Sequence, residues 1–185
     1  MAERLLTRDG YDGLTIEAVA VAAEVGRPTI YRRWPDKAHL VLAIVSRAGG
    51  RRSLTDTGSL RGDLLAVHRE QARLFNSKQF RTVVPALLGR LATDEVLARA
   101  YRADFVDIRR QELARALDRA MVRGEIGQLD VDDVFDRLCG PLFYRVIVRG
   151  RRVDSDFARS VVDGLIASLI DERPHPVSDH AGESS

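Results

Sequence analysis

Apolar residues recur every three or four positions along most of the chain, whereas runs that alternate apolar and polar residues are nearly absent. This spacing is typical of amphipathic helices, which pack through one apolar face. In the first part of the chain we expect short helices at residues 2–9, 16–23, 27–33 and 37–48. Farther along we expect longer helices at residues 60–77, 79–92, 94–123, 131–148 and 154–171. The pattern therefore predicts an all-α fold.

Glycine, proline and small polar residues divide these helices into two modules. Residues 49–59 are rich in Gly, Arg, Ser and Thr, which indicates a linker between a module at 1–48 and a larger one at 60–171. Inside the larger module we expect interruptions near Pro85 and at Gly140–Pro141, because proline removes a helical hydrogen bond. The polar tail at 172–185 contains two further prolines, and we expect it to be disordered.

Composition narrows the class of protein. Hydrophobic residues make up 45% of the chain, which excludes global disorder. The net charge of +2 is mild, but residues 25–40 carry three arginines and one lysine against a single aspartate. A short basic stretch of this kind is what a polyanion such as DNA attracts.

The cysteine count, the apolar runs and the N-terminus indicate the cellular compartment. Cys139 is the only cysteine, so no internal disulfide can form, which fits a reducing cytoplasm. No apolar run approaches the ~18 residues of a membrane span. The N-terminus is charged at Glu3 and Arg4, so we do not expect a signal peptide there. We therefore expect a cytoplasmic protein without a membrane partner.

The helices expected at 16–23 and 27–33 are short and joined by a tight turn, as in a helix-turn-helix. In that device the second helix enters the DNA major groove, while the first packs behind it on small residues. Ala18, Ala22 and Ala23 supply small residues on the first helix, and Ile30 and Trp34 are suited to fill the core behind the second. We therefore expect an N-terminal, homeodomain-like module of three helices.

Side chains around the second helix are candidates for DNA contact. Arginine pairs bidentately with guanine, and a threonine methyl group can touch thymine, so base readout would fall to Arg27, Thr29, Arg32 and Arg33. Phosphate contacts would come from hydroxyl groups and from a lysine at a helix start. The predicted DNA-binding residues are Thr15, Arg27, Pro28, Thr29, Tyr31, Arg32, Arg33 and Lys37. The competing interpretation is that the aromatic residues are core and the arginines are solvated surface charges.

Residues 15–41, TIEAVAVAAEVGRPTIYRRWPDKAHLV, resemble the DNA-binding domain of the TetR family of bacterial repressors. The shared pattern is a threonine that opens the second helix, alanines, a tight turn, a Thr-Ile-Tyr core, an aromatic residue and a lysine that opens the fourth helix. In this chain these are Thr15, Ala18, Ala22, Thr29, Ile30, Tyr31, Trp34 and Lys37. The segment GPLFYRVIVRG at 140–150 is similar to a C-terminal segment of some such regulators.

The resemblance implies a helical C-terminal domain with a ligand cavity, a dimer built from the last two helices, and repression that a small molecule relieves. Glu24 stands where the family usually has glycine, so either the backbone there is left-handed, at a cost of about 1 kcal/mol or more, or the turn differs from that of the family. The first helix is shorter than is usual in the family. A chain that is truncated, or that begins at a late start codon, would have such a helix.

The larger module should hold the ligand cavity and the dimer surface. Predicted pocket residues are Phe75, Phe80, Leu87, Leu91, Tyr101, Phe105, Ile108, Leu138, Leu142 and Phe143, with His68, Gln71, Arg109 and Tyr144 as further polar candidates to orient a ligand. Apolar stripes on the last two helices exceed what one small core needs. The predicted dimer residues are Val134, Leu138, Val146, Phe157, Val161, Leu165 and Leu169. The competing interpretation is that both sets are simple core.

The sequence offers no catalytic constellation. No cluster of histidines, cysteines and acids has metal-ligand spacing, and no phosphate loop, nucleophile elbow or paired-carboxylate signature is present. We therefore expect no enzyme activity, metal or cofactor, and a homodimeric repressor that binds a palindromic operator and leaves it when a small molecule binds. Two alternatives stay open: a helical small-molecule-binding protein with a vestigial helix-turn-helix, and an adaptor that binds protein through its first module.

Overall fold

A computed structural model describes residues 1–48 and 56–171 of the chain, where every regular element is a helix. The N-terminal part contains α1 (Ala2–Gly13), α2 (Ile16–Ala22), α3 (Arg27–Arg33) and α4 (Lys37–Ala48). The larger part contains α5 (Leu60–Asn76), α6 (Lys78–Leu91), α7 (Glu95–Tyr101), α8 (Asp107–Val122), α9 (Val131–Phe143) and α10 (Ser155–Asp171). Two π-helical segments, η1 (Arg102–Val106) and η2 (Tyr144–Val148), follow α7 and α9. The prediction of an all-α fold is confirmed, while the expected tail at 172–185 lies outside the described residues.

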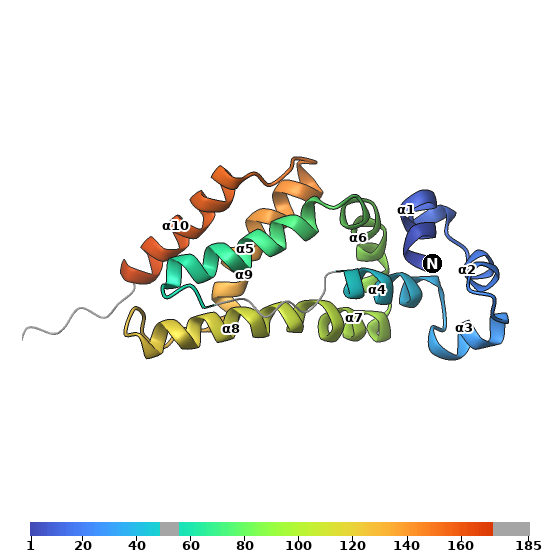
Figure 1. Cartoon of the computed structure of the whole chain (residues 1–185), viewed down its shortest axis with the longest axis horizontal. Coiled ribbons are helices and arrows are strands. Elements are labelled where there is room, and N and C mark those ends of the chain that lie inside the picture. Colours follow the sequence, from blue (N-terminus) through green and yellow to red (C-terminus); the bar gives the residue numbers. More distant parts are fainter. Residues whose placement is uncertain (49–55, 172–185) are drawn as a thin grey trace, which may run out of the picture.

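The molecule is elongated, with α1, α2 and α3 at one end and α10 toward the other (Figure 1). Between these ends lies α4, which contacts α1, α6, α7 and η1. The long α8 continues α7 and η1 along one side of the molecule (Figure 1). On the other side α5 packs against α8, α9 and α10. Helix α4 is therefore the element through which the two parts of the molecule touch most broadly.

Two clusters of buried apolar side chains hold the helices together. The first cluster runs from α1–α4 into α6, α7 and η1, and its members include Ile30, Val41, Val83, Leu97 and Phe105. The second cluster joins α5, α8, α9 and α10. Because the first cluster includes residues of both modules, a change in the packing of α6, α7 or η1 reaches α4 directly.

Polar side chains define the helix starts. The hydroxyl of Ser59 accepts a hydrogen bond from the Gly62 N–H (3.1 Å). The hydroxyl of Ser77 accepts one from Phe80, and the carboxylate of Asp94 accepts one from Leu97. Each is an N-cap, which satisfies a backbone donor that the first turn of a helix leaves free.

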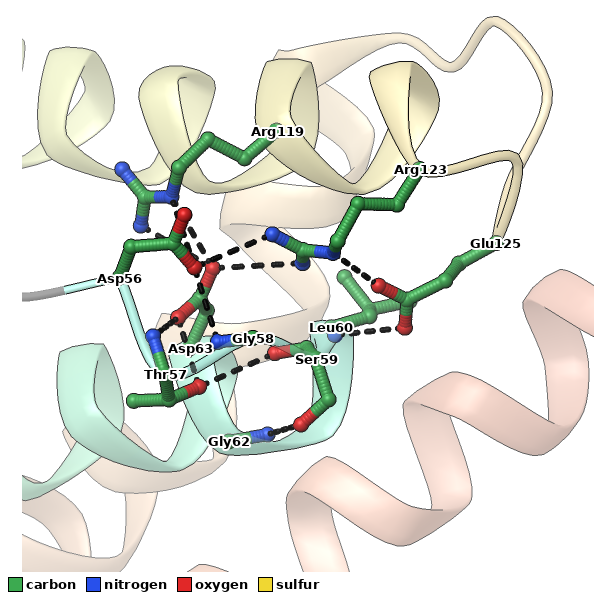
Figure 2. Close-up of polar contacts among 10 residues, drawn as sticks. All are labelled: Asp56, Thr57, Gly58, Ser59, Leu60, Gly62, Asp63, Arg119, Arg123 and Glu125. Atoms are coloured by element: carbon green, nitrogen blue, oxygen red, sulfur yellow. Dashed lines mark hydrogen bonds and ion pairs between the residues drawn. The ribbon is translucent and has the colours of Figure 1, made fainter.

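A buried carboxylate links the start of α5 to the end of α8. One oxygen of Asp63 accepts hydrogen bonds from the Thr57 N–H and hydroxyl, both at 2.8 Å, and the other accepts one from Arg119 at 3.1 Å (Figure 2). Arg123 and Glu125 extend the network to the backbone of Leu60 (Figure 2). Burial alone would raise the pKa of Asp63, but these hydrogen bonds outweigh it and hold the pKa below its usual value. The network fixes the chain where it enters the larger module.

The interruptions differ from those the sequence predicted. The expected single helix at 94–123 contains η1, where the Asp107 N–H bonds to the Arg102 carbonyl five residues back. The expected break at Pro85 is absent: α6 passes through it, because Arg81 and Pro85 are exposed and water can bond the carbonyl that proline leaves free. Likewise α9 runs through Pro141, and the irregular turn follows at η2. Among the described residues, no helix is both long and apolar enough to cross a membrane.

Candidate nucleic-acid interface and ligand cavity

Helix α3 is attached to the module through one residue and presents the others to solvent. Ile30 is 5% exposed and belongs to the core, and Trp34 just beyond the helix is half-buried. The predicted contact residues of the helix are all exposed: Arg27, Pro28, Thr29, Tyr31, Arg32 and Arg33. A seven-residue helix held by one buried residue on its inner side leaves its outer face available to a groove.

The turn before α3 sets its direction relative to α2. Glu24 has a φ of 56°, in the left-handed region. The Val25 N–H bonds to the Ala20 carbonyl and the Glu24 N–H to the Val21 carbonyl, at 3.0 and 3.1 Å, which is the Schellman motif that ends α2. Of the two alternatives at Glu24, a left-handed backbone and a different turn, the structure has the left-handed backbone, on a residue with a β-carbon.

Thr15 opens α2 and keeps a free donor. Its hydroxyl oxygen accepts a hydrogen bond from the Ala18 N–H at 3.1 Å, so the hydroxyl hydrogen remains available. The side chain is exposed at the start of the helix that lies behind α3. This arrangement suits a hydrogen bond to a phosphate oxygen.

The cationic side chains around α3 differ in how firmly neighbouring groups hold them. Arg27 lies 3.5 Å from the carboxylate of Glu17, in an exposed pair that is weak in water. The guanidinium of Arg33 lies 5.0 Å from the Trp34 ring centroid, a cation–π contact. The ammonium of Lys37 donates to the Asp12 carbonyl at 3.3 Å and lies 4.6 Å from the Tyr11 ring centroid. Arg27 and Arg33 are exposed, whereas Lys37 is partly held against the end of α1.

A cavity of about 300 Å³ lies beside η1 in the larger module. Four of the predicted pocket residues line it, namely Phe75, Tyr101, Phe105 and Phe143. Its further lining residues are Gln71, Val106, Arg109, Phe135, Asp136, Cys139 and Gly140. Phe80, Leu87, Leu138 and Leu142 are buried core residues that do not line this cavity, and neither do Leu91 and Ile108, so for these six residues a pocket role stays a prediction. Periodicity identifies an inward-facing residue but cannot separate a packed core position from a cavity wall.

Polar groups of the cavity region are buried. Gln71 is 4% exposed, His68 one turn away is fully buried, and Arg109 is 8% exposed. Burial lowers the pKa of His68 to about 4 and raises the pKa of the Cys139 thiol to about 12. At neutral pH the imidazole is therefore uncharged and the thiol protonated, which makes the thiol unreactive.

The predicted dimer residues lie mostly inside the subunit. Val134, Leu138, Val146, Leu165 and Leu169 are at most 5% exposed in the single subunit, so burial within the subunit already accounts for them and their assignment to an interface stays an untested prediction. The reason is that α5 and α8 pack against α9 and α10 and cover these stripes. Phe157 and Val161 are only partly buried, so for these two residues an interface role stays a prediction.

Three potential metal ligands from two segments of the sequence meet in the fold. Single donor atoms of Asp36, His39 and Asp94 lie within 4.8 Å of one another. Arg90 bridges the two carboxylates, at 3.0 Å from Asp36 and 3.3 Å from Asp94. The guanidinium already supplies a positive charge to this group, so we describe it as an ion-pair cluster between α4, α6 and α7.

Two family models match successive parts of the chain. Residues 1–44 match the family model for bacterial regulatory proteins of the tetR family. Residues 54–165 match the model of a tetracyclin repressor-like C-terminal domain.

Relatives resemble the chain over most of its length. A DNA-binding transcriptional repressor TetR of Mycobacteroides abscessus is 34% identical and aligns over 92% of this chain and 90% of its own. An uncharacterized HTH-type transcriptional regulator, YdeS of Bacillus subtilis, is 33% identical over 85% of this chain and 80% of its own. The crystal structure of the TetR family transcription regulator SCO0332 superposes with a TM-score of 0.75 at 30% identity, covering 91% of this chain and 93% of that one.

Proposed function

The chain belongs to the TetR family of bacterial helix-turn-helix transcriptional regulators, and we propose that it is a repressor that a small molecule releases from its operator. In this proposal residues 1–48 bind DNA and residues 60–171 bind the ligand and a second subunit. The repressor of Mycobacteroides abscessus, 34% identical, supports repression rather than activation. Such a regulator would work in the cytoplasm, where the bacterial chromosome lies.

The observation that carries the proposal is the exposed outer face of α3. Thr29, Tyr31 and Arg32 lie there in solvent while Ile30 anchors the helix. We infer that α3 enters the major groove, that Arg27, Thr29, Arg32 and Arg33 read bases, and that Thr15, Tyr31 and Lys37 bind phosphates. Two such helices in a dimer would reach successive grooves about 34–36 Å apart on a palindrome.

The link between ligand and DNA would run through α4. The wall of the cavity includes Phe105 and Val106 of η1, and η1 contacts α4. The first turn of α4 holds Lys37, four residues beyond the end of α3. A ligand that favours one position of η1 would shift the population of α4 positions, and with it the spacing of the two α3 helices.

The dimer would use the outward faces of the last helices, since the inward stripes are covered. Gly164 and Ala167 are exposed on α10, and Tyr144 and Val148 of η2 are 57% and 63% exposed. Small residues let two helices approach closely, and exposed apolar side chains gain from being covered. We therefore assign the partner contact to this face.

The direct test is binding of the full chain to the DNA upstream of its own coding sequence, followed by fluorescence anisotropy at several salt concentrations. We expect saturable binding to one palindrome and a linear fall of log affinity with log salt. The matched variant is Thr29→Ala with Tyr31→Phe, which changes exposed groups of α3 without touching Ile30. It should lose preference for the palindrome over unrelated DNA.

Two results would contradict the proposal. Absence of binding at any concentration would support the alternative of a ligand-binding protein with a vestigial helix-turn-helix. Equal affinity for the palindrome and for unrelated DNA would show that α3 does not read bases.

A further inference from the structure

Arg109 carries a buried positive charge that no carboxylate of the described residues pairs with. The residue is 8% exposed, and its guanidinium donates a hydrogen bond to the Phe105 carbonyl and lies 3.8 Å from the Phe105 ring centroid. Burial lowers the pKa of Arg109, although the charges of Glu112 and Tyr101 oppose that change. A guanidinium has five N–H donors, and the hydrogen bond to Phe105 uses only one of its nitrogens. Burial of such a charge without a carboxylate in direct contact costs folding free energy, which the more distant charge of Glu112 offsets only in part, so its retention points to a role outside the stability of the subunit.

Gln71 is a second polar group that the subunit satisfies poorly. It is 4% exposed, its amide atoms have no nitrogen or oxygen partner among the described residues, and the group it meets is the thiol of Cys139, which is only a weak hydrogen-bonding group. Gln71 lines the same cavity as Arg109, from the opposite helix α5. Buried polar groups in proteins are almost always hydrogen-bonded, so a poorly satisfied amide in a cavity wall indicates a bound polar group.

The rest of the cavity wall is predominantly aromatic. Its apolar part consists of Phe75, Tyr101, Phe105, Val106, Phe135 and Phe143. The one acidic lining residue is Asp136, which is exposed, so water screens its charge. The volume of about 300 Å³ lies at the small end of the range for small-molecule sites, about 300–1,000 Å³.

We propose that this cavity binds a small organic acid, in which Arg109 holds the carboxylate, Gln71 hydrogen-bonds it or a neighbouring polar group, and the aromatic wall covers a single ring or a short aliphatic body. A carboxylate matches the fork of a guanidinium with two parallel hydrogen bonds, and the low local dielectric strengthens that pair. The inference rests on the proposed function, because it names the class of ligand that the proposed regulator would sense.

The same contact explains how the ligand would act on the fold. The Arg109 guanidinium bonds to the carbonyl of Phe105, which lies in η1, and η1 contacts α4. A carboxylate bound to Arg109 competes with the Phe105 carbonyl for the guanidinium, and so weakens the hydrogen bond between Arg109 and η1. Wide π turns occur often at functional sites, where such a local change is tolerated.

The test is isothermal titration calorimetry of the full chain with matched probes. Benzoate, phenylacetate and octanoate supply the carboxylate, benzamide and phenylacetamide are the neutral counterparts, and inorganic phosphate is an anion without an apolar body. We expect at least one carboxylate to bind about tenfold to hundredfold more tightly than its amide, as a charge-assisted hydrogen bond requires. Phosphate should bind more weakly than that carboxylate.

Arg109→Met separates a ligand-binding role from a structural one. We expect it to abolish the preference for carboxylate over amide while the ligand-free protein melts at the same or a higher temperature, because a buried unpaired charge has been removed. Arg109→Lys should keep part of the preference, since it keeps the charge but not the fork. Arg115→Met on the exposed side of the same helix is the matched control and should leave binding unchanged.

Several outcomes would overturn the proposal. Among these are no binding of any carboxylate at millimolar concentration, equal affinity for acid and amide, or tighter binding of phosphate. A large fall in melting temperature for Arg109→Met would assign the residue to structure. Because calorimetry needs no DNA, a chain that binds acids but no operator contradicts only the proposed regulation, whereas one that binds operator but no acid contradicts only the ligand class.

Discussion

The guanidinium of Arg90 lies 3.0 Å from the carboxylate of Asp36, and this ion pair ties the end of α6 to the start of α4. The same carboxylate accepts hydrogen bonds from the backbone N–H and the ring of His39, at 3.0 and 2.9 Å. Asp36 thus caps the helix that follows α3 and is at the same time held by α6 of the larger module. The pair is a direct polar connection between the two proposed modules.

We predict that Arg90→Gln alters operator affinity more than stability. The pair is partly exposed, and such pairs contribute about 0–1 kcal/mol to folding. Losing it frees α4 from α6, so operator affinity should change by about threefold to thirtyfold, the usual size of a coupling term of about 0.5–2 kcal/mol. Chemical unfolding measures the change in folding free energy, and fluorescence anisotropy measures the change in operator affinity. Arg73→Gln, which breaks an exposed pair with Glu70 on α5, is the control and should change neither.

Lys37→Ala should weaken binding to all DNA sequences alike. If the ammonium neutralises one phosphate, the variant reduces the slope of log affinity against log salt by about one unit. Arg90→Gln should leave that slope unchanged, because Arg90 is assigned no DNA contact. If the Lys37→Ala variant has the same slope as the wild type, Lys37 does not contact a phosphate. Its ammonium in the wild type would then stay with the Asp12 carbonyl and the Tyr11 ring when DNA binds.

Glu24→Gly should stabilise the DNA-binding module. The Schellman motif that ends α2 places Glu24 at a φ of 56°, whereas the equivalent motif at the end of α8 has Gly124 at 74°. A β-carbon in this region costs about 1–2 kcal/mol, and part of that is offset by the larger unfolded-state entropy of glycine, so we expect a gain of about 0.5–1 kcal/mol. Urea unfolding measures it.

Glu24→Ala is the matched control for that change. It removes the same carboxylate but keeps the β-carbon, so it should not stabilise the turn. A gain of equal size in both variants would assign the effect to charge and not to backbone strain.

The sequence predicted the helices well because their signals are local. The helix expected at 27–33 corresponds to α3, and its start is marked by Gly26 and Pro28 next to the exposed residues. The helix at 37–48 likewise corresponds to α4. The π turn of η1 has no such local mark, since it depends on how Phe105 packs between α7, α8 and the cavity.

The site could be predicted only in part, for a different reason. The sequence marks Arg109 and Gln71 as polar residues near an apolar face, but the burial of Arg109 and the lack of a strong partner for Gln71 appear only when the helices are assembled. Asp36 and Arg90 are separated by 54 residues, so nothing in the local pattern joins them. The apolar stripe through Leu138 and Leu165 looks the same whether a partner subunit or α5 covers it.

The buried imidazole of His68 predicts a loss of stability in mild acid. Burial lowers its pKa from 6.5 to about 4, so between these values the unfolded chain binds a proton that the folded chain does not. Stability is therefore full above about pH 6.5 and falls as the pH drops toward 4, by about 3 kcal/mol in total. His68→Leu should flatten this fall, measured as urea unfolding across the range.

Two comparisons keep the assignment to His68 unambiguous. The pKa of Asp63 lies below its ordinary value of 3.8, so its stabilising effect is lost only at lower pH. Gln71→Leu removes a buried polar side chain from the same helix without a titrating group, so it should keep the wild-type pH slope. Parallel curves for wild type and His68→Leu would contradict a neutral, buried imidazole.

Gly164 offers the sharpest test of the dimer face. It lies exposed within α10, and a β-carbon there would meet no atom within 4 Å, so the packing of the subunit does not require glycine. Glycine inside a helix costs about 1 kcal/mol relative to alanine, a cost that close approach of a partner helix would explain. We predict that Gly164→Arg yields folded monomers by light scattering, with reduced operator affinity because each half-site is then bound separately.

Gly89→Arg is the matched control, since Gly89 is also exposed in a helix with open space around its β-carbon position, but lies on α6. It should leave the dimer intact. If Gly164→Arg remains dimeric at the wild-type concentration dependence, α10 does not pack closely on a partner at this position. The proposed dimer face would then be reduced to its other exposed residues, Tyr144 and Val148, where a charged substitution such as Val148→Glu would be the corresponding probe.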